Sequence, residues 1–152
     1  MAYDVPQLLQ MSSSALDALF SSSICGDIPN GPAKGTAIIA SDTVYSPEIA
    51  EFVNLFVWQG KNFNAAKGEL CNRISVFGLS AIIAKVYKAT SLLDDKECIV
   101  LDYSETSMVA HWIRDEIRLI QPDFYLGRVY WDNKPLIHFC LQFGAAVAAP
   151  QG

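Results

Sequence analysis

The sequence predicts a mainly β protein, α+β in class, in which two N-terminal helices precede a small antiparallel barrel. From residue 68 onward, short segments rich in β-branched and aromatic residues follow one another, divided by turn signals such as "LLDDK". The intervals are too short for the crossover helices that parallel strands require, so consecutive strands must pair antiparallel in a meander. Before residue 60 the apolar residues instead recur at helical spacing.

The first 35 residues predict one helix followed by one loop. The segment "SSSALDALFSSS" offers serine N-caps, and Leu16, Leu19 and Phe20 fall on one helical face, which predicts a helix over 13–21. The following "CGDIPNGPAKG" concentrates glycine, proline and asparagine, and it predicts a loop.

A strand and a second helix are expected next. The apolar "GTAIIA" at 35–40 predicts a short strand. Ser46 and Pro47 are suited to the N-cap and first position of a helix, which we predict over 47–57.

The remaining chain predicts the wall of the barrel. Further strands are expected near residues 69–77, 80–89, 97–104, 113–120, 124–131 and 136–143. Asp132, Asn133 and Lys134 predict a tight hairpin between the last two strands. Such a meander can curl into a closed or nearly closed barrel.

The chain length predicts a single domain over residues 1–152. Within it, 1–34 would hold the first helix and loop, 35–143 the second helix and the barrel, and 144–152 a loose tail without periodicity.

Composition excludes several classes of partner. The net charge is −5 and no basic cluster occurs, so we expect no nucleic acid and no anionic membrane as partner. No apolar run reaches the ~20 residues of a membrane helix. The start "MAYDVPQLLQ" lacks the features of a secretory signal, which predicts a cytoplasmic protein. Hydrophobic residues make up 51% of the chain. We expect this apolar surplus to lie in a core, in a lined cavity or in an interface between copies of the chain.

The sequence also predicts that the protein uses neither metal nor cofactor. Four cysteines are far apart, and the chain has two histidines, so we expect reduced thiols and no metal site. There is no Gly-x-Ser-x-Gly, phosphate loop or dinucleotide fingerprint. Serine hydrolases of the α/β type, P-loop NTPases and NAD(P)-dependent dehydrogenases are therefore not expected.

The charged stretch "DYSETSMVAHWIRDEIR" (102–118) is the most unusual part of the chain. The apolar residues of its second half fit a helix as well, but the strand-rich neighbourhood favours a strand. As a strand, 113–120 places four residues on one face: Ile113, Asp115, Ile117 and Leu119. The other face, expected to be solvated, carries Arg114, Glu116 and Arg118. A carboxylate among aliphatic side chains needs a cationic partner or a raised pKa; the possible partners are Arg73, His111 and His138.

These residues supply candidates for acid/base chemistry. Asp115 or Asp102 would act as the carboxylate, His111 or His138 as its partner, and Tyr103 as a hydrogen-bond donor to a substrate oxygen. Arg114 could stabilise an anion if the register is one residue off. In the strand at 97–104, either Asp102 or Tyr103 belongs to the inner face, and the sequence leaves this open. In the last strand, His138 shares the face opposite the apolar stripe.

Aromatic residues are numerous enough to line a cavity for a small apolar or aromatic ligand, although they could equally fill a solid core. The predicted lining is Trp58, Phe63, Tyr87, Tyr125, Trp131 and Phe139.

The segments "LFSSSICGDIPNGPAKG", "WQGKNF" and "DEIR…FYLGRVYW" resemble small, mostly uncharacterised bacterial proteins with a lipocalin-like (calycin) barrel. The layout is distantly similar to the family named for a Gly-x-Trp-x-Gly motif. The resemblance implies a barrel and a ligand cavity, and it assigns no catalytic residue.

Two functions follow as hypotheses. In the first, a cofactor-independent barrel enzyme acts by acid/base chemistry, of isomerase, cyclase, lyase or hydrolase type, on a small hydrophobic molecule in an apolar cavity. In the second, the protein is a non-catalytic carrier of a hydrophobic ligand or an oligomeric interaction module, such as a homodimer.

Overall fold

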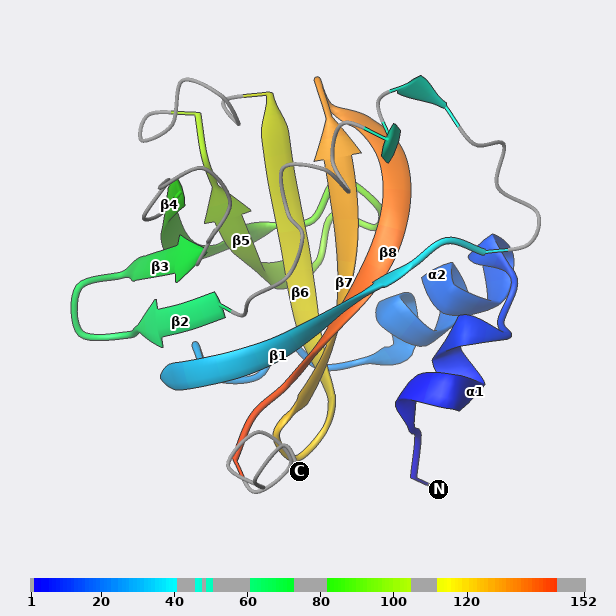
Figure 1. The fold of residues 1–152 in the computed structure, drawn as a ribbon, viewed down its shortest axis with the longest axis horizontal. Coiled ribbons are helices and arrows are strands. Elements are labelled where there is room, and N and C mark those ends of the chain that lie inside the picture. The colour runs from blue at the N-terminus through cyan, green and yellow to red at the C-terminus, as the bar shows by residue number, and fades with distance from the viewer. Residues whose placement is uncertain are drawn as a thin grey trace.

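The computed structural model describes residues 2–40, 46–47, 49–50, 61–72, 82–104 and 112–144. The protein is mainly β, as predicted: strands pair antiparallel with their sequence neighbours, and the last closes on the first to form a barrel (Figure 1). The helices are α1 (Val5–Leu9) and α2 (Ser13–Ser22). The strands are β1 (Gly31–Ile38), β2 (Lys61–Asn64), β3 (Glu69–Asn72), β4 (Ile82–Thr90), β5 (Glu97–Asp102), β6 (Ile113–Gln121), β7 (Phe124–Trp131) and β8 (Lys134–Gln142).

Most predicted elements are found close to their expected bounds. The helix predicted over 13–21 is α2, and the strand predicted over 113–120 is β6. The hairpin between β7 and β8 is confirmed, because Asp132 and Asn133 form a two-residue loop in which both have positive φ, the geometry of a type I′ turn. Of the helix predicted over 47–57, the structure describes residues 47, 49 and 50, and these three are helical.

Three features differ from the prediction. The predicted loop at 25–35 already contains the start of β1, because Gly31 to Ala33 pair with β2. Strand β2 was not predicted, since "KNFN" offers one apolar residue and its pairing with β1 and β3 decides its conformation. Helix α1 was also missed: it is too short to show periodicity, although the Asp4 side chain caps it by accepting a hydrogen bond from the Gln7 N–H at 2.8 Å.

Close-packed side chains fill the described part of the barrel interior. The buried members of this inner core include Phe63, Leu70, Ile99, Leu101, Tyr103, Ile117, Tyr125, Phe139, Leu141 and Phe143. The ring of Phe143 packs edge-on against Phe63 and Tyr125, at centroid distances of 5.4 and 5.5 Å. Gly127 lies opposite Phe139, and a Cβ at residue 127 would come within 2.2 Å of the Phe139 ring. This close approach explains a glycine in the middle of β7.

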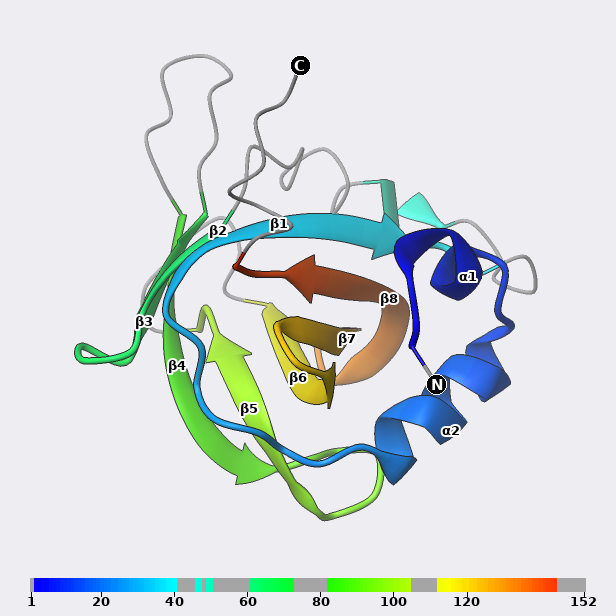
Figure 2. The ribbon, with the colours of Figure 1, turned by 90° about the horizontal axis from the view of Figure 1, so that it is seen from below.

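A second apolar layer covers the outside of the barrel wall. Helices α1 and α2 lie against the outer surface (Figure 2), where α1 contacts β1 and α2 contacts β6 and β8. The buried members of this outer core are Leu8, Leu16, Phe20, Ile38, Ala40, Cys98, Val100, Phe124, Leu126 and Cys140. Both faces of β5 and β7 are therefore buried, and much of the apolar surplus of the composition lies in this layer.

The outer layer overturns the expectation that Glu116 and Arg118 are solvated. The side chains of these two residues are 0% and 1% exposed. Arg114, at 24%, keeps partial access to solvent. The charges on this face of β6 are thus covered by α2 and by the β4–β5 loop, which the local pattern of β6 could not reveal.

Arg118 is held by hydrogen bonds from all its guanidinium N–H groups. Two go to the Asp94 carboxylate, at 2.6 and 2.7 Å, and the others go to the backbone carbonyls of Phe20, Lys96 and Glu97, at 3.0 to 3.1 Å. These bonds account for the five donors of an arginine side chain. The guanidinium carbon also lies 4.5 Å from the centre of the Phe20 ring.

Glu116 is satisfied in a similar way. Its carboxylate accepts hydrogen bonds from the Ser91 hydroxyl at 2.7 Å and the Leu92 N–H at 2.9 Å, and it pairs with Arg114 at 2.9 Å. The two buried charges on the outer face of β6 thus hold the β4–β5 loop, residues 91–96, against the wall. Among the described residues, no helix is long and apolar enough to cross a membrane.

We predict that Asp94→Asn lowers the free energy of unfolding by about 3 kcal/mol at neutral pH, because it breaks a mostly buried ion pair. The hydrogen bonds from Arg118 hold the pKa of Asp94 well below its ordinary value. The stabilisation is therefore fully present above pH ~4 and is lost as the pH falls through the lowered pKa. Urea unfolding of the native protein and the variant across pH measures the difference.

The matched control is Asp95→Asn, which alters the exposed residue next to Asp94. Asp95 has a positive φ, a conformation that asparagine tolerates. We expect it to leave stability within about 0.5 kcal/mol. A difference between the native protein and Asp94→Asn that stays constant down to the lowest pH would contradict the role of the charge.

Candidate functional site

The barrel interior contains the carboxylate that the sequence places there. Asp115 is fully buried on the inner face of β6, between Leu101 of β5 and Val129 of β7, and it shares this face with Ile113 and Ile117. The predicted orientation of Asp115 is therefore confirmed. Its role in catalysis stays a prediction.

The alternative that the sequence left open for β5 is resolved in favour of Tyr103. Ile99, Leu101 and Tyr103 belong to the inner core, and Tyr103 is fully buried. Leu101 pairs with Asp115, so Tyr103 is a diagonal neighbour of Asp115 on the same face. The structure therefore brings these two predicted residues together at one end of the barrel.

Asp102 and Arg114 face outward instead, so the structure does not bring them to the interior. Asp102 accepts hydrogen bonds from the Tyr87 hydroxyl at 2.7 Å and from the hydroxyl and N–H of Ser104, at 2.6 and 2.9 Å. Burial alone would raise the pKa of Asp102, but these hydrogen bonds hold it below its ordinary value. The contacts of Asp102 are those of a structural carboxylate. The possible partners Arg73 and His111 lie outside the described residues.

His138 belongs to a polar cluster between α2 and the outer face of the barrel. Its Nε2 donates to Asp17 Oδ1 of α2 at 2.7 Å, and Arg128 Nε donates to the same oxygen at 2.9 Å. Arg128 also donates to the Tyr130 hydroxyl and lies over the Tyr130 ring. His138 thus lies on the face opposite the apolar stripe, as predicted, but it is buried there. Asp17, 121 residues away in the chain, was not predicted as its partner.

The cluster keeps Asp17 ionised. Burial alone would raise the pKa of Asp17, but the hydrogen bond from His138 and the nearby charge of Arg128 hold it below its ordinary value. The only signal in the sequence was an acidic residue within a helix of otherwise small and apolar residues.

A pocket of about 280 Å³, called here the helix pocket, opens beside this cluster. It is lined by Ser13, Asp17, Arg128, Val129, Pro135, Leu136, Ile137 and His138. The lining therefore combines the hydrogen-bonded polar cluster with apolar side chains, the usual composition of a ligand site.

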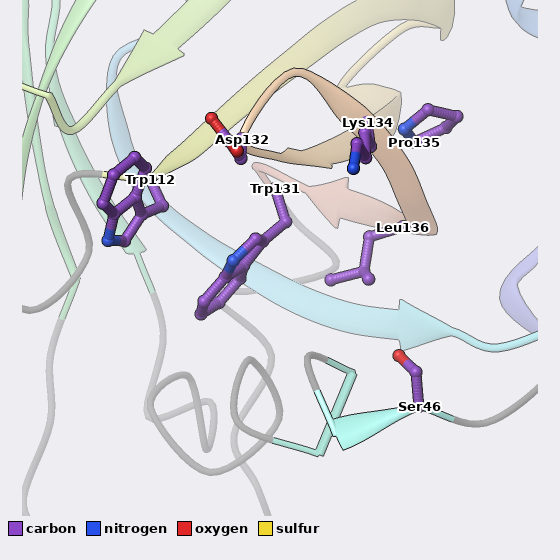
Figure 3. Close-up of a pocket in the computed structure, with 7 residues that line it drawn as sticks. All are labelled: Ser46, Trp112, Trp131, Asp132, Lys134, Pro135 and Leu136. Atoms are coloured by element: carbon purple, nitrogen blue, oxygen red, sulfur yellow. The ribbon is translucent and has the colours of Figure 1, made fainter.

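A larger pocket of about 470 Å³, called here the rim pocket, lies at the β7–β8 end of the barrel (Figure 3). It is lined by Ser46, Trp112, Trp131, Asp132, Lys134, Pro135 and Leu136. Trp112 is 51% exposed, whereas Trp131 and Leu136 are partly buried and pack on the inner core. Ile113 pairs with Trp131, and Asp115 is two residues further along β6, or roughly 7 Å. The rim pocket therefore lies at the end of the barrel that holds Asp115 and Tyr103.

The described aromatic residues of the predicted lining lie in three different parts of the structure. Phe63, Tyr125 and Phe139 lie in the inner core, and Trp131 lines the rim pocket. Tyr87 packs with the outer core, so it does not line the interior. Burial raises the pKa of Tyr125 to about 12, and its hydroxyl donates to the Asp27 carbonyl at 2.6 Å. Trp58 lies outside the described residues.

A further pocket of about 430 Å³ lies over β2, β3 and the start of β1. Its polar lining includes Asn30, Asn62, Asn64, Lys67 and Glu69. Asn30 is already engaged, because its side-chain oxygen accepts from the Ala65 N–H at 2.9 Å. Of the predicted catalytic residues that the structure describes, none lines this pocket.

The four cysteines, all within the described part of the chain, are free thiols. Cys98 and Cys140 belong to the outer core, where burial raises their pKa to about 12 and about 11. A thiolate nucleophile is therefore not available at either position near neutral pH. The described residues contain no group of three or more His, Cys, Asp or Glu side chains that could hold a metal ion.

We predict that a thiol reagent counts four thiols after denaturation without reductant. In the native protein, the half-buried Cys25 and Cys71 should react first, and Cys98 and Cys140 should react only on unfolding. The measurement is a time course of thiol release with mass mapping of the labelled peptides. A total of two or zero would mean that disulfides form, and fast labelling of Cys98 would contradict its burial.

Comparison with known proteins supports the fold and goes no further. No family model and no curated protein matches the chain. A crystal structure of a protein from Thermomonospora curvata is similar, with a TM-score of 0.63 and 15% identity over 89% of this chain and 89% of that one. At this level of identity the likeness shows a shared barrel fold alone. Membership of the calycin group or of the Gly-x-Trp-x-Gly family stays a prediction.

Proposed function

We propose that the protein binds a small apolar or aromatic molecule at the rim pocket. The observation that carries this proposal is a pocket of ligand size, about 470 Å³, flanked by two tryptophans of which one is half exposed. Indole rings supply large apolar surface for stacking against an apolar or aromatic ligand. Because the described interior is closely packed, the rim is a better site than the centre of the barrel.

Acid/base catalysis on the bound molecule is a second candidate function. It is supported by the complete burial of Asp115 on the inner face. Asp115 lies roughly 7 Å along β6 from Ile113, the residue that pairs with Trp131 of the rim pocket. A fully buried carboxyl group, with Tyr103 as its diagonal neighbour on the inner face, suits proton transfer of the isomerase, cyclase, lyase or hydrolase type. Such chemistry needs no cofactor.

A carrier or an oligomeric module such as a homodimer is the non-catalytic alternative. Native mass spectrometry separates these possibilities. A monomer or dimer that retains a small molecule supports ligand binding, whereas an empty obligate oligomer supports the interaction module.

We predict that 4-phenylbutanol binds the rim pocket and shifts the indole N–H signals of Trp112 and Trp131 in a saturable NMR titration. Trp131→Leu should weaken binding about tenfold, or about 1.4 kcal/mol, because one aromatic wall is lost. Tyr87→Phe, which alters an outward residue of β4, should leave the affinity unchanged. Saturable shifts confined to other parts of the barrel would contradict the proposed location.

We predict that Asp115→Asn folds normally and abolishes conversion of the bound molecule, followed by mass spectrometry of the mixture. The substitution keeps the size and polarity of the side chain and removes its titration. Loss of folding, at a cost of roughly 3–5 kcal/mol, would instead assign Asp115 to a structural ion pair. A variant with unchanged stability and unchanged conversion would rule out both roles.

A further inference from the structure

The rim pocket and the helix pocket adjoin. Both are lined by Pro135 and Leu136, at the start of β8. The β7–β8 register explains why: Val129 pairs with Ile137, but Tyr130 pairs with Pro135, so Leu136 is left unpaired in a bulge. A bulge re-aims the side chain of the extra residue. Figure 3 shows Leu136 directed into the rim pocket, on the same side of the hairpin as the Trp131 indole.

The far end of the helix pocket presents a carboxylate to a ligand. The Asp17 side chain is 32% exposed, whereas those of Arg128 and His138 are 7% and 9% exposed. Both side chains donate to Oδ1, and the described residues give Oδ2 no hydrogen bond. A carboxylate has about four acceptor positions, so Oδ2 keeps capacity to accept from a ligand.

The surroundings favour a donor over an acceptor at this end. The Arg128 guanidinium lies over the Tyr130 ring and donates a hydrogen bond to the Tyr130 hydroxyl. A ligand therefore meets the partly exposed carboxylate before it meets the buried side chains of Arg128 and His138. The net charge of −5 also draws cations toward the protein.

We propose that the two pockets are one groove, and that it binds an elongated amphipathic amine. The ammonium group donates to Asp17 Oδ2, and the apolar body crosses Leu136 to reach Trp112 and Trp131. Residues 136 and 138 are roughly 7 Å apart along β8, which a short flexible carbon chain spans. This inference rests on the proposed binding at the rim pocket and adds the chemical class of the ligand.

The test uses three compounds with one skeleton and different head groups: 4-phenylbutylamine, 4-phenylbutanol and 4-phenylbutyrate. Calorimetry at pH 7 and fixed ionic strength should give the order amine, alcohol, acid, from tightest to weakest. Asp17→Asn should weaken the amine about tenfold and change the alcohol less than twofold. Asp102→Asn is the matched control, because it removes the same charge from the outer face of β5 at a residue that lines neither pocket.

The outcomes separate this inference from the proposed function. If the acid binds as tightly as the amine, or if both variants weaken the amine equally, the inference is overturned. In that case the proposed binding at the rim pocket is still supported if 4-phenylbutanol shifts the indole N–H signals of Trp112 and Trp131. If none of the three compounds binds, both proposals fall.

A measurement on the unmodified protein covers the case in which Asp17→Asn displaces α2. Intermolecular nuclear Overhauser effects should connect the nitrogen-bearing methylene of 4-phenylbutylamine to the His138 ring and its phenyl group to the Trp131 indole. The reverse orientation, or contacts with only one of the two ends, would overturn the single-groove arrangement.

Discussion

The Arg118 guanidinium is the contact on which the outer half of the structure depends. It joins the end of α2, through the Phe20 carbonyl, to the β4–β5 loop, through Asp94 and Lys96. A buried arginine is tolerable only when its donors are satisfied, and here all of them are. Because Asp17 lies one helical turn before Phe20, the position of the candidate head-group site follows from where Arg118 holds the helix.

Strand alternation was sufficient to predict the inner face of β6. It put Ile113, Asp115 and Ile117 on the inner face, and β6 has them there. It failed on the outside, where Glu116 and Arg118 are covered by segments distant in sequence. Periodicity reports which residues share a face, but whether that face meets water is decided by tertiary contacts.

Only part of the candidate site could be predicted from the sequence, for the same reason. The pattern of β8 assigns His138 to the outer face, yet nothing local identifies Asp17 as its partner. The bulge at Leu136 could not be predicted either, because a bulge depends on how two strands pair and not on the sequence of one strand. The fold class, in contrast, depends on strand order and short connections, which a single sequence displays directly.

The contact between Gly127 and Phe139 has a consequence for the evolution of this barrel. The two residues face each other on neighbouring strands, and the ring occupies the space that any side chain at 127 would need. The pair therefore divides a fixed volume, so that a larger residue on β7 can be accommodated only with a smaller one on β8. In relatives of this protein, a larger residue at one of these two positions should be accompanied by a smaller residue at the other. Such covariation would identify the register between β7 and β8 from sequences alone.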